Sequence, residues 1–131
     1  MSATFQGRDL FAPVAGMIAE GVAIEELARE IEDLVMLEVQ PATGAQGRVI
    51  HVDRFGNAMT NVPADVVEGL GTRQVKFGRR MVVLKRTYGD VSVGDGLALI
   101  GSSGLLELAV NGGSAAQKLD VKVGDQVLLD S

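Results

Sequence analysis

The spacing of apolar residues predicts helices in the first third of the chain. Asp9 is placed to cap a helix that ends at Gly21, and the apolar residues between them fall at helical spacing. A second helix is predicted over residues 24–35, where acidic residues lie opposite an apolar face. That face consists of Ile24, Leu27, Ala28, Ile31, Leu34 and Val35. We expect residues 1–46 to form a helical lead-in.

After residue 46 the apolar residues occur in short alternating runs bounded by Gly, Asn or Asp, which is typical of strands and tight turns. The expected strands are Gly47–Val52, Ala58–Val62, Gln74–Phe77, Met81–Arg86, Leu97–Ile100, Leu105–Val110 and Gln126–Leu129. Helical turns are expected at Ala64–Leu70 and Ser114–Leu119. Strands of this length and spacing indicate an antiparallel barrel or sandwich. The predicted fold is therefore mainly β, a small antiparallel β-barrel over residues 47–131 preceded by one or two helices.

A repeated turn helps to place two of these strands. Asp90–Leu97 reads DVSVGDGL and Asp120–Val127 reads DVKVGDQV, so the same Val-x-Val-Gly-Asp turn is expected to begin a strand twice. Coincidence within a valine-rich β domain is the alternative interpretation.

Composition narrows the possible functions. The chain has 131 residues, one domain by length, and 47% of them are hydrophobic, which is typical of a globular protein. It has neither a run of 18 apolar residues nor a basic start followed by an apolar stretch, so we expect a cytoplasmic protein. The absence of Cys and the single His exclude thiolate and His-rich metal sites, and no metal is predicted. A net charge of −5 argues against nucleic acid as the partner.

The stretch His51–Val62 is more polar than a connection between two strands requires. It combines a carboxylate, a ring, carboxamides and a hydroxyl, supplied by Asp53, Phe55, Asn57, Asn61 and Thr60, around a turn at Gly56. Such a set suits a polar ligand that contains a ring. The simpler interpretation is a bulged hairpin whose polar side chains satisfy one another.

A second candidate site is Gly101–Gly113, which reads GSSGLLELAVNGG. Ser102 and Ser103 offer hydroxyls beside backbone amides that a ligand can approach closely. Glu107 is the one charge in an apolar strand, and it either faces solvent, the simpler interpretation, or meets a hydrogen-bond donor or cation.

Two further features are less specific. Tyr88, the only Tyr, either stacks on a ligand ring or caps the core. Residues 73–86 contain six of the twelve Lys and Arg, but the one aromatic residue among them is Phe77. A solvated hairpin or an acidic partner surface therefore suits this stretch better than a nucleic acid does.

Several runs together resemble a known family. They are TFQGRDLFAP (Thr4–Pro13), VDRFGNAMTNV (Val52–Val62), TYGDVSVGDGLALIGSSGLLELAVNGGSAA (Thr87–Ala116) and VKVGDQVLL (Val121–Leu129). In order and spacing they resemble the C-terminal domain of the S-adenosylmethionine hydroxide adenosyltransferases, which are related to the S-adenosylmethionine-dependent fluorinase and chlorinase. The resemblance implies hydrolysis of S-adenosylmethionine (SAM) to adenosine and methionine, by attack of activated water at the ribose 5′ carbon. It also implies trimers that bind SAM between the N-terminal α/β domain of one subunit and the C-terminal β-barrel of the next. SAM is then a substrate, and no cofactor is expected.

The resemblance assigns roles to individual residues. Asp53 with Ser102 or Ser103 would hold the methionine amino and carboxylate ends. Asn57 and the backbone from Val110 to Gly112 would bond the adenine edge, while Phe5 and Tyr88 supply stacking surface and Glu107 a further contact. An adenine is bound by ring faces and amide groups, and a sulfonium beside an ammonium is bound by carboxylates. The residue types therefore agree with the roles that the resemblance assigns.

The chain departs from the family in two ways. We expect the N-terminal α/β domain to be absent, together with its Asp and Arg that act on ribose and water. Gln6 also stands where the family has His in Thr-Phe-His-Gly-Arg-Asp. Gln has no titratable proton near neutral pH and cannot act as a base, so this chain alone is not expected to be catalytic.

Three hypotheses follow. In the first, the chain is the SAM- or adenosine-binding half of such an enzyme and associates as a trimer or with a separate N-terminal domain. In the second, it is a stand-alone binding protein or scaffold without turnover. In the third, which the net charge disfavours, residues 73–86 bind RNA with a steep dependence on salt.

Overall fold

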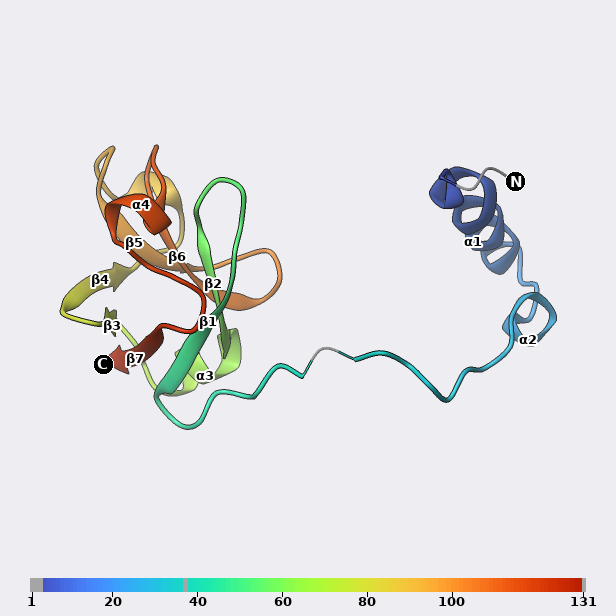
Figure 1. The fold of residues 1–131 in the computed structure, drawn as a ribbon, viewed down its shortest axis with the longest axis horizontal. Helices are drawn as coiled ribbons and strands as arrows, with labels where there is room; N and C mark the ends of the chain where they lie inside the picture. Colours follow the sequence, from blue (N-terminus) through green and yellow to red (C-terminus); the bar gives the residue numbers. More distant parts are fainter. Residues whose placement is uncertain (1–3, 37, 131) are drawn as a thin grey trace. The chain divides into compact units, whose positions relative to one another are not determined.

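The computed structural model describes residues 4–36 and 38–130 (Figure 1). It divides into two compact units, Met1–Leu37 and Glu38–Ser131. The first contains only helical elements and the second contains all of the strands.

In the first unit a π-helical turn, η1 (Gly7–Phe11), continues directly into the helix α1 (Ala12–Ala19). Pro13 lies in the first turn of α1, where its missing N–H breaks no helical bond. The helix ends at Gly21 as predicted, with Gly21 N bonded to Ile18 O and Val22 N to Met17 O, both at 3.0 Å.

Asp9 does not cap this helix, so that detail of the prediction is wrong. Gln6 occupies the N-cap position and makes no side-chain cap bond, whereas Asp9 lies inside η1. There its carboxylate pairs with the guanidinium of Arg8, whose Nε lies 2.6 Å from Oδ1.

The predicted second helix is much shorter than its apolar pattern indicates. The helix α2 (Ile24–Leu27) is one turn long, and residues 28–36 form no helix or strand. Ile31 is 61% exposed and Val35 98% exposed. An amphipathic helix is stabilised mainly by packing of its apolar face, so this pattern needs a surface to pack against.

The second unit is a closed β-barrel, which confirms the predicted fold class. Its strands are β1 (Gln46–Val52), β2 (Ala58–Pro63), β3 (Gln74–Phe77), β4 (Arg80–Leu84), β5 (Gly96–Ile100), β6 (Leu105–Val110) and β7 (Gln126–Asp130). They pair in the order β1-β2-β6-β5-β4-β3-β7, and β7 pairs with β1 to close the barrel. The pairing is antiparallel except between β4 and β5, which run parallel through Val83↔Leu97 and Leu84↔Ala98.

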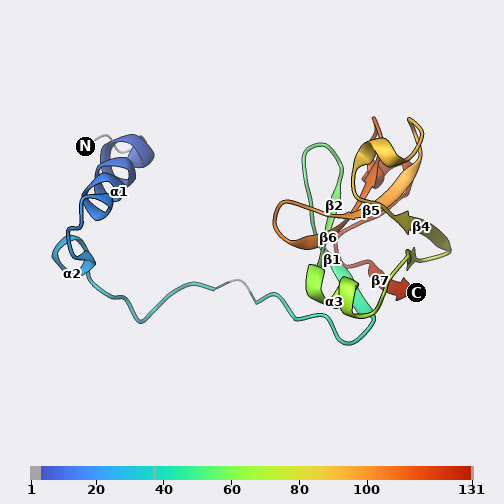
Figure 2. The same ribbon diagram turned by 180° about the vertical axis from the view of Figure 1, so that it is seen from behind.

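The barrel interior is filled by alternating apolar side chains, as the period of two predicts. Thr60 is the polar exception, and its buried hydroxyl donates to Leu106 O at 2.8 Å. Helix α3 (Ala64–Gly69) lies at one end of the barrel and helix α4 (Ala115–Lys118) at the other (Figures 1 and 2). Their buried residues Val67 and Ala115 belong to the same core.

A second apolar cluster lies outside this interior, on β5 and β6. Leu97, Leu99 and Ala109 are buried there, and Val91 packs against them. Val91 belongs to the long connection from β4 to β5, which contains the 3₁₀ turn η2 (Tyr88–Asp90). The connection therefore covers the outer face of β5 and β6, and this cover positions Tyr88.

The repeated Val-x-Val-Gly-Asp turn begins β5 and β7, as predicted. Gly94 and Gly124 have nearly the same backbone, with φ of 91° and 94°. The two valines of each copy differ in their burial, however. The first of each pair packs against apolar residues, whereas Val93 and Val123 are exposed.

Candidate functional site

The loop between β1 and β2 is organised by the carboxylate of Asp53. Its Oδ1 accepts hydrogen bonds from Phe55 N at 2.8 Å and Asn57 N at 2.9 Å, and its Oδ2 from Asn57 Nδ2 at 3.3 Å. Burial raises the pKa of Asp53, but the hydrogen bonds from Asn57 and Phe55 outweigh it and hold that pKa below its ordinary value. Asp53 and Asn57 thus satisfy each other as the simpler interpretation expects, while Asp53 remains ionised.

Phe55 extends from this loop and is 65% exposed. The guanidinium of Arg54 lies 4.8 Å from the centre of its ring. Gly56, at the turn, is buried against Ser114, and its carbonyl accepts from Ala116 N at 2.9 Å. The loop is therefore fastened to the segment that leads into α4.

Glu107 does not face solvent, so the simpler interpretation of this residue is wrong. It lies on β6 opposite Met59 of β2 and Leu99 of β5, and it is 9% exposed. The hydroxyl of Tyr88 donates to Glu107 Oε1 at 2.7 Å. Burial raises the pKa of Tyr88 to about 12, with further contributions from this hydrogen bond and from the charges of Glu107 and Asp53. Tyr88 is therefore neutral at physiological pH.

The turn between β5 and β6 carries the two candidate serines. Ser102 and Ser103 are both exposed, and the Ser103 hydroxyl lies 3.7 Å from the sulfur of Met59. A Cβ added at Gly101 would lie 2.9 Å from Glu107 Oε2. The serine turn is thus adjacent to Glu107 through Met59 and Gly101.

The remaining predicted contacts follow β6. Val110 is buried and Gly112 is exposed in the turn after it. Between them Asn111 binds the connection that carries Tyr88, because its Nδ2 donates to Val91 O at 2.9 Å and its carbonyl accepts from Gly94 N at 2.7 Å. The sequence alone did not single out Met59.

The structure therefore brings the barrel residues of the prediction into linked groups. The β1–β2 loop, η2 and α4 lie at the same end of the barrel (Figures 1 and 2). Asp53 acts on Tyr88 electrostatically, Tyr88 bonds to Glu107, and Glu107 neighbours Met59. Phe5 and Gln6 belong to the other unit, where the Arg8 guanidinium lies 4.7 Å from the centre of the Phe5 ring.

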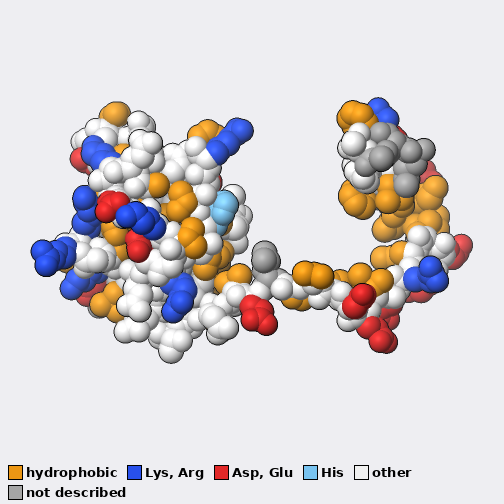
Figure 3. Space-filling view, in the orientation of Figure 1, with side chains coloured by type: hydrophobic (Ala, Val, Ile, Leu, Met, Phe, Trp, Pro, Cys, Tyr) orange, Lys and Arg blue, Asp and Glu red, His pale blue; other side chains and the backbone are white. Residues whose placement is uncertain are grey.

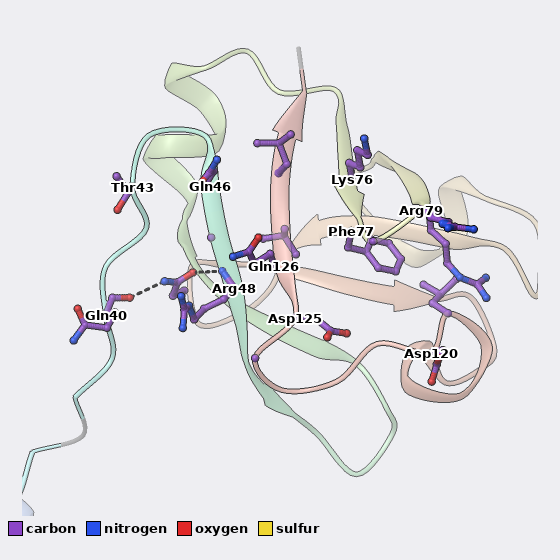
Figure 4. Close-up of a pocket in the computed structure, with 18 of the residues that line it drawn as sticks. Gln40, Thr43, Gln46, Arg48, Lys76, Phe77, Arg79, Asp120, Asp125 and Gln126 are labelled. Carbon is purple, nitrogen blue, oxygen red and sulfur yellow. Dashed lines mark hydrogen bonds between the residues drawn. The ribbon is translucent and has the colours of Figure 1, made fainter.

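A large concavity of the barrel lies elsewhere. It is a basin of about 900 Å³ between β1, β7 and the β3–β4 turn, and of the residues that the sequence suggested for a site only Asn61 lines it (Figure 4). Asn61 lies at its edge and holds the incoming chain, with Nδ2 bonded to Gln40 O at 2.6 Å and Oδ1 to Arg48 N at 2.7 Å. Asn61 thus serves the fold, although the sequence suggested it for a site.

The basin is positively charged. Arg48, Lys76, Arg79 and Arg80 line it, and none of them forms an ion pair with another described residue. Of its two acidic residues, Asp120 pairs with Lys122, and the carboxylate of Asp125 accepts from Lys122 N at 2.8 Å. Figure 3 shows Lys and Arg side chains gathered on the β3–β4 side of the barrel. This charge agrees with the predicted solvated hairpin or acidic partner surface.

Among residues 4–36 and 38–130, no three or more His, Cys, Asp or Glu side chains are grouped as metal ligands. No helix within these ranges is long and apolar enough to cross a membrane.

Comparison with known proteins identifies the family. Residues 47–128 match the family model of the SAM hydroxide adenosyltransferase C-terminal domain. A protein from Thermus thermophilus named (R)-S-adenosyl-L-methionine hydrolase is 44% identical over 129 residues, covering 97% of this chain and 49% of that protein. A fluorinase from Actinopolyspora mzabensis is 28% identical, covering 95% of this chain and 47% of the fluorinase.

A solved structure is also similar to this chain. That of an uncharacterized conserved protein from Thermotoga maritima matches with a TM-score of 0.67 and 37% identity, covering 99% of this chain and 54% of that one. The chain spans about half the length of the curated relatives it matches. By the family match and these relatives, the chain belongs to the SAM hydroxide adenosyltransferase family, whose C-terminal domain is the barrel described here.

Proposed function

We propose that the barrel forms one wall of a site for S-adenosylmethionine, in a protein that hydrolyses SAM to adenosine and methionine. The observation that carries this proposal is the hydrogen-bonded pair Tyr88 and Glu107, with the ionised Asp53 at the same end of the barrel, in a chain from this family. The names of two relatives support SAM as the ligand class.

The charges of this wall suit a cationic ligand. Asp53 is ionised, and neither Asp53 nor Glu107 forms an ion pair with a described residue. The sulfonium and ammonium of SAM supply the positive charges that two such carboxylates attract. Adenosine retains the purine but lacks both cations, so it tests ring recognition separately.

The remaining roles follow the family resemblance. Ser102 or Ser103 holds the methionine carboxylate, and Asp53 binds the methionine ammonium. Asn57 and the backbone from Val110 to Gly112 bond the adenine edge, and Tyr88 stacks on its face. Both serines are exposed, which supports their availability to a ligand.

The wall is one half of the site, and the chain alone does not turn SAM over. Phe55, Tyr88, Ser102 and Ser103 are exposed, and none of them lies in the basin. The second wall then comes from an N-terminal α/β domain, within a trimer or as a separate chain. Gln6 supplies no base, so water activation also depends on groups outside this chain.

Titration of the isotope-labelled chain with SAM and with adenosine, followed by nuclear magnetic resonance, tests this function. A half-site binds weakly, and we expect dissociation constants in the millimolar range with shifts at Tyr88 and in the β1–β2 loop. Replacing Asp53 by Asn should weaken SAM more than adenosine. If neither compound shifts these residues at millimolar concentration, the proposal is wrong.

The same titration separates the alternative of a stand-alone binding protein. Micromolar affinity in the isolated chain, with no adenosine or methionine released, would favour binding without turnover. Release of adenosine by this chain alone would contradict its catalytic incompetence.

A further inference from the structure

Glu107 is a nearly buried carboxylate with mostly apolar neighbours. Its neighbours across the strands are Met59 and Leu99, and its Oε2 lies toward the backbone of Gly101. Burying a carboxylate without a cation is unfavourable unless hydrogen bonds compensate. The bond from Tyr88 is the one hydrogen bond from a described side chain to Glu107, and it is short and charge-assisted.

Tyr88 is held at two points. Its backbone lies in η2, where Asp90 Oδ2 accepts from Thr87 N at 2.9 Å and from Arg86 N at 3.1 Å. Tyr88 is 39% exposed, and its hydroxyl makes no other hydrogen bond to a described residue. Asp90 therefore holds the backbone of the turn that carries Tyr88, and Glu107 holds the hydroxyl end of its ring.

We propose that Glu107 is a positioning residue that acts through Tyr88, holding the phenol ring ready as a stacking surface for the purine of the ligand. This inference rests on the proposed function only where it concerns the ligand. A ring ordered before binding loses less side-chain freedom on binding. Loss of the restraint should therefore weaken purine binding by about 3- to 10-fold, as expected for one immobilised side chain.

The chain is well suited to a direct test, because it has one Tyr and no Trp. Tyrosine absorbance and near-ultraviolet circular dichroism therefore report Tyr88 alone among the strongly absorbing rings. Glu107→Leu keeps a side chain of similar size but removes both its charge and the acceptor of the Tyr88 hydroxyl. We expect the pKa of Tyr88 to fall from about 12 toward its ordinary value of 10.0. We also expect its near-ultraviolet band to weaken at pH 7, while the far-ultraviolet spectrum stays native.

The matched control is Glu68→Leu, which removes an exposed charge at α3. It should leave both tyrosine signals unchanged. If Glu107→Leu also leaves both unchanged, Glu107 does not position Tyr88. The near-ultraviolet band at pH 7 decides whether Glu107 positions Tyr88, even if the barrel unfolds at a pH too low for Tyr88 to ionise.

Adenosine titrations of four proteins test the ligand part: the original chain, Glu107→Leu, Tyr88→Phe and the double variant. A residue that acts only through the Tyr88 hydroxyl loses its effect when that hydroxyl is absent. We therefore expect each single variant to weaken adenosine binding and the double variant to be no weaker than Tyr88→Phe. An equal further loss in the double variant would show that Glu107 acts on the ligand directly and would overturn the inference. Absence of any adenosine effect in the original chain would instead overturn the proposed function, while the tyrosine spectra still decide the Tyr88–Glu107 contact.

Discussion

Substitution of Gly56 by Ala should destabilise the barrel by much more than the loss of a flexible residue. Gly56 has φ of +87°, and an added Cβ would overlap Ser114 Oγ and lie 2.7 Å from Ser114 Cβ. The left-handed backbone costs a non-glycine residue about 1–2 kcal/mol. Crowding at a packed contact costs about 1–3 kcal/mol more.

The crowding also affects a helix cap. Ser114 Oγ accepts from Gln117 N at 3.2 Å and caps α4, and losing such a cap costs about 1 kcal/mol. Together these effects give about 3–6 kcal/mol for Gly56→Ala. For a domain of this size, each kcal/mol lowers the melting temperature by about 4–8 °C, so a fall of more than about 10 °C is expected.

Gly78→Ala is the matched control in thermal unfolding followed by circular dichroism. Gly78 also has a positive φ, +55°, but a Cβ there meets nothing within 4 Å. Gly78→Ala should therefore lower the free energy of unfolding only by the cost of the left-handed backbone, about 1–2 kcal/mol. Combining Gly56→Ala with Ser114→Gly should restore the stability lost to crowding, because it removes the Ser114 side chain that the new Cβ meets. The cap of α4 should be largely kept, because Gly is also a good N-cap. If Gly56→Ala and Gly78→Ala were equally destabilising, the contact with Ser114 would have no energetic weight and this reasoning would be refuted.

Three further predictions concern the polar groups of the barrel. Thr60→Val should lower the free energy of unfolding by about 1–3 kcal/mol in urea denaturation, because it leaves the buried carbonyl of Leu106 without its 2.8 Å donor. Asn61→Ala should speed proteolysis within residues 38–46, because it removes the 2.6 Å bond to Gln40 O; an unchanged rate would contradict that role. Asp53 has a folded pKa below the ordinary 3.8, so its contribution to stability is complete above that value and is lost as pH falls through the folded pKa. Acid unfolding of Asp53→Asn should lack this part of the pH dependence, and identical acid transitions would argue against it.

The strands were largely predictable because short-range pattern determines them. Gln74–Phe77 and Leu105–Val110 form with the expected bounds, since apolar alternation and flanking turn residues act over a few positions. The helix over residues 24–35 was not predictable in this way. Its periodicity is real, but a helix of that length needs a surface to pack against, and the sequence of the helix does not contain that surface.

The environment of Glu107 could not be predicted from its own strand. Alternation places it outside the barrel interior, which is correct, and this favoured solvent exposure. What buries it is the connection carrying Tyr88 and Val91, which folds back over β5 and β6. That cover depends on a parallel crossover between β4 and β5, a long-range feature that no local pattern signals.

The parallel contact between β4 and β5 also has a dynamic consequence. Two residue pairs join these strands, whereas five join β5 to β6. Local opening occurs first where the fewest contacts must break, so amide hydrogens of this pair should exchange with deuterium before those of β5 and β6. Tyr88 itself bonds to Glu107 of β6, so its ring is anchored on the side of this contact that should exchange more slowly.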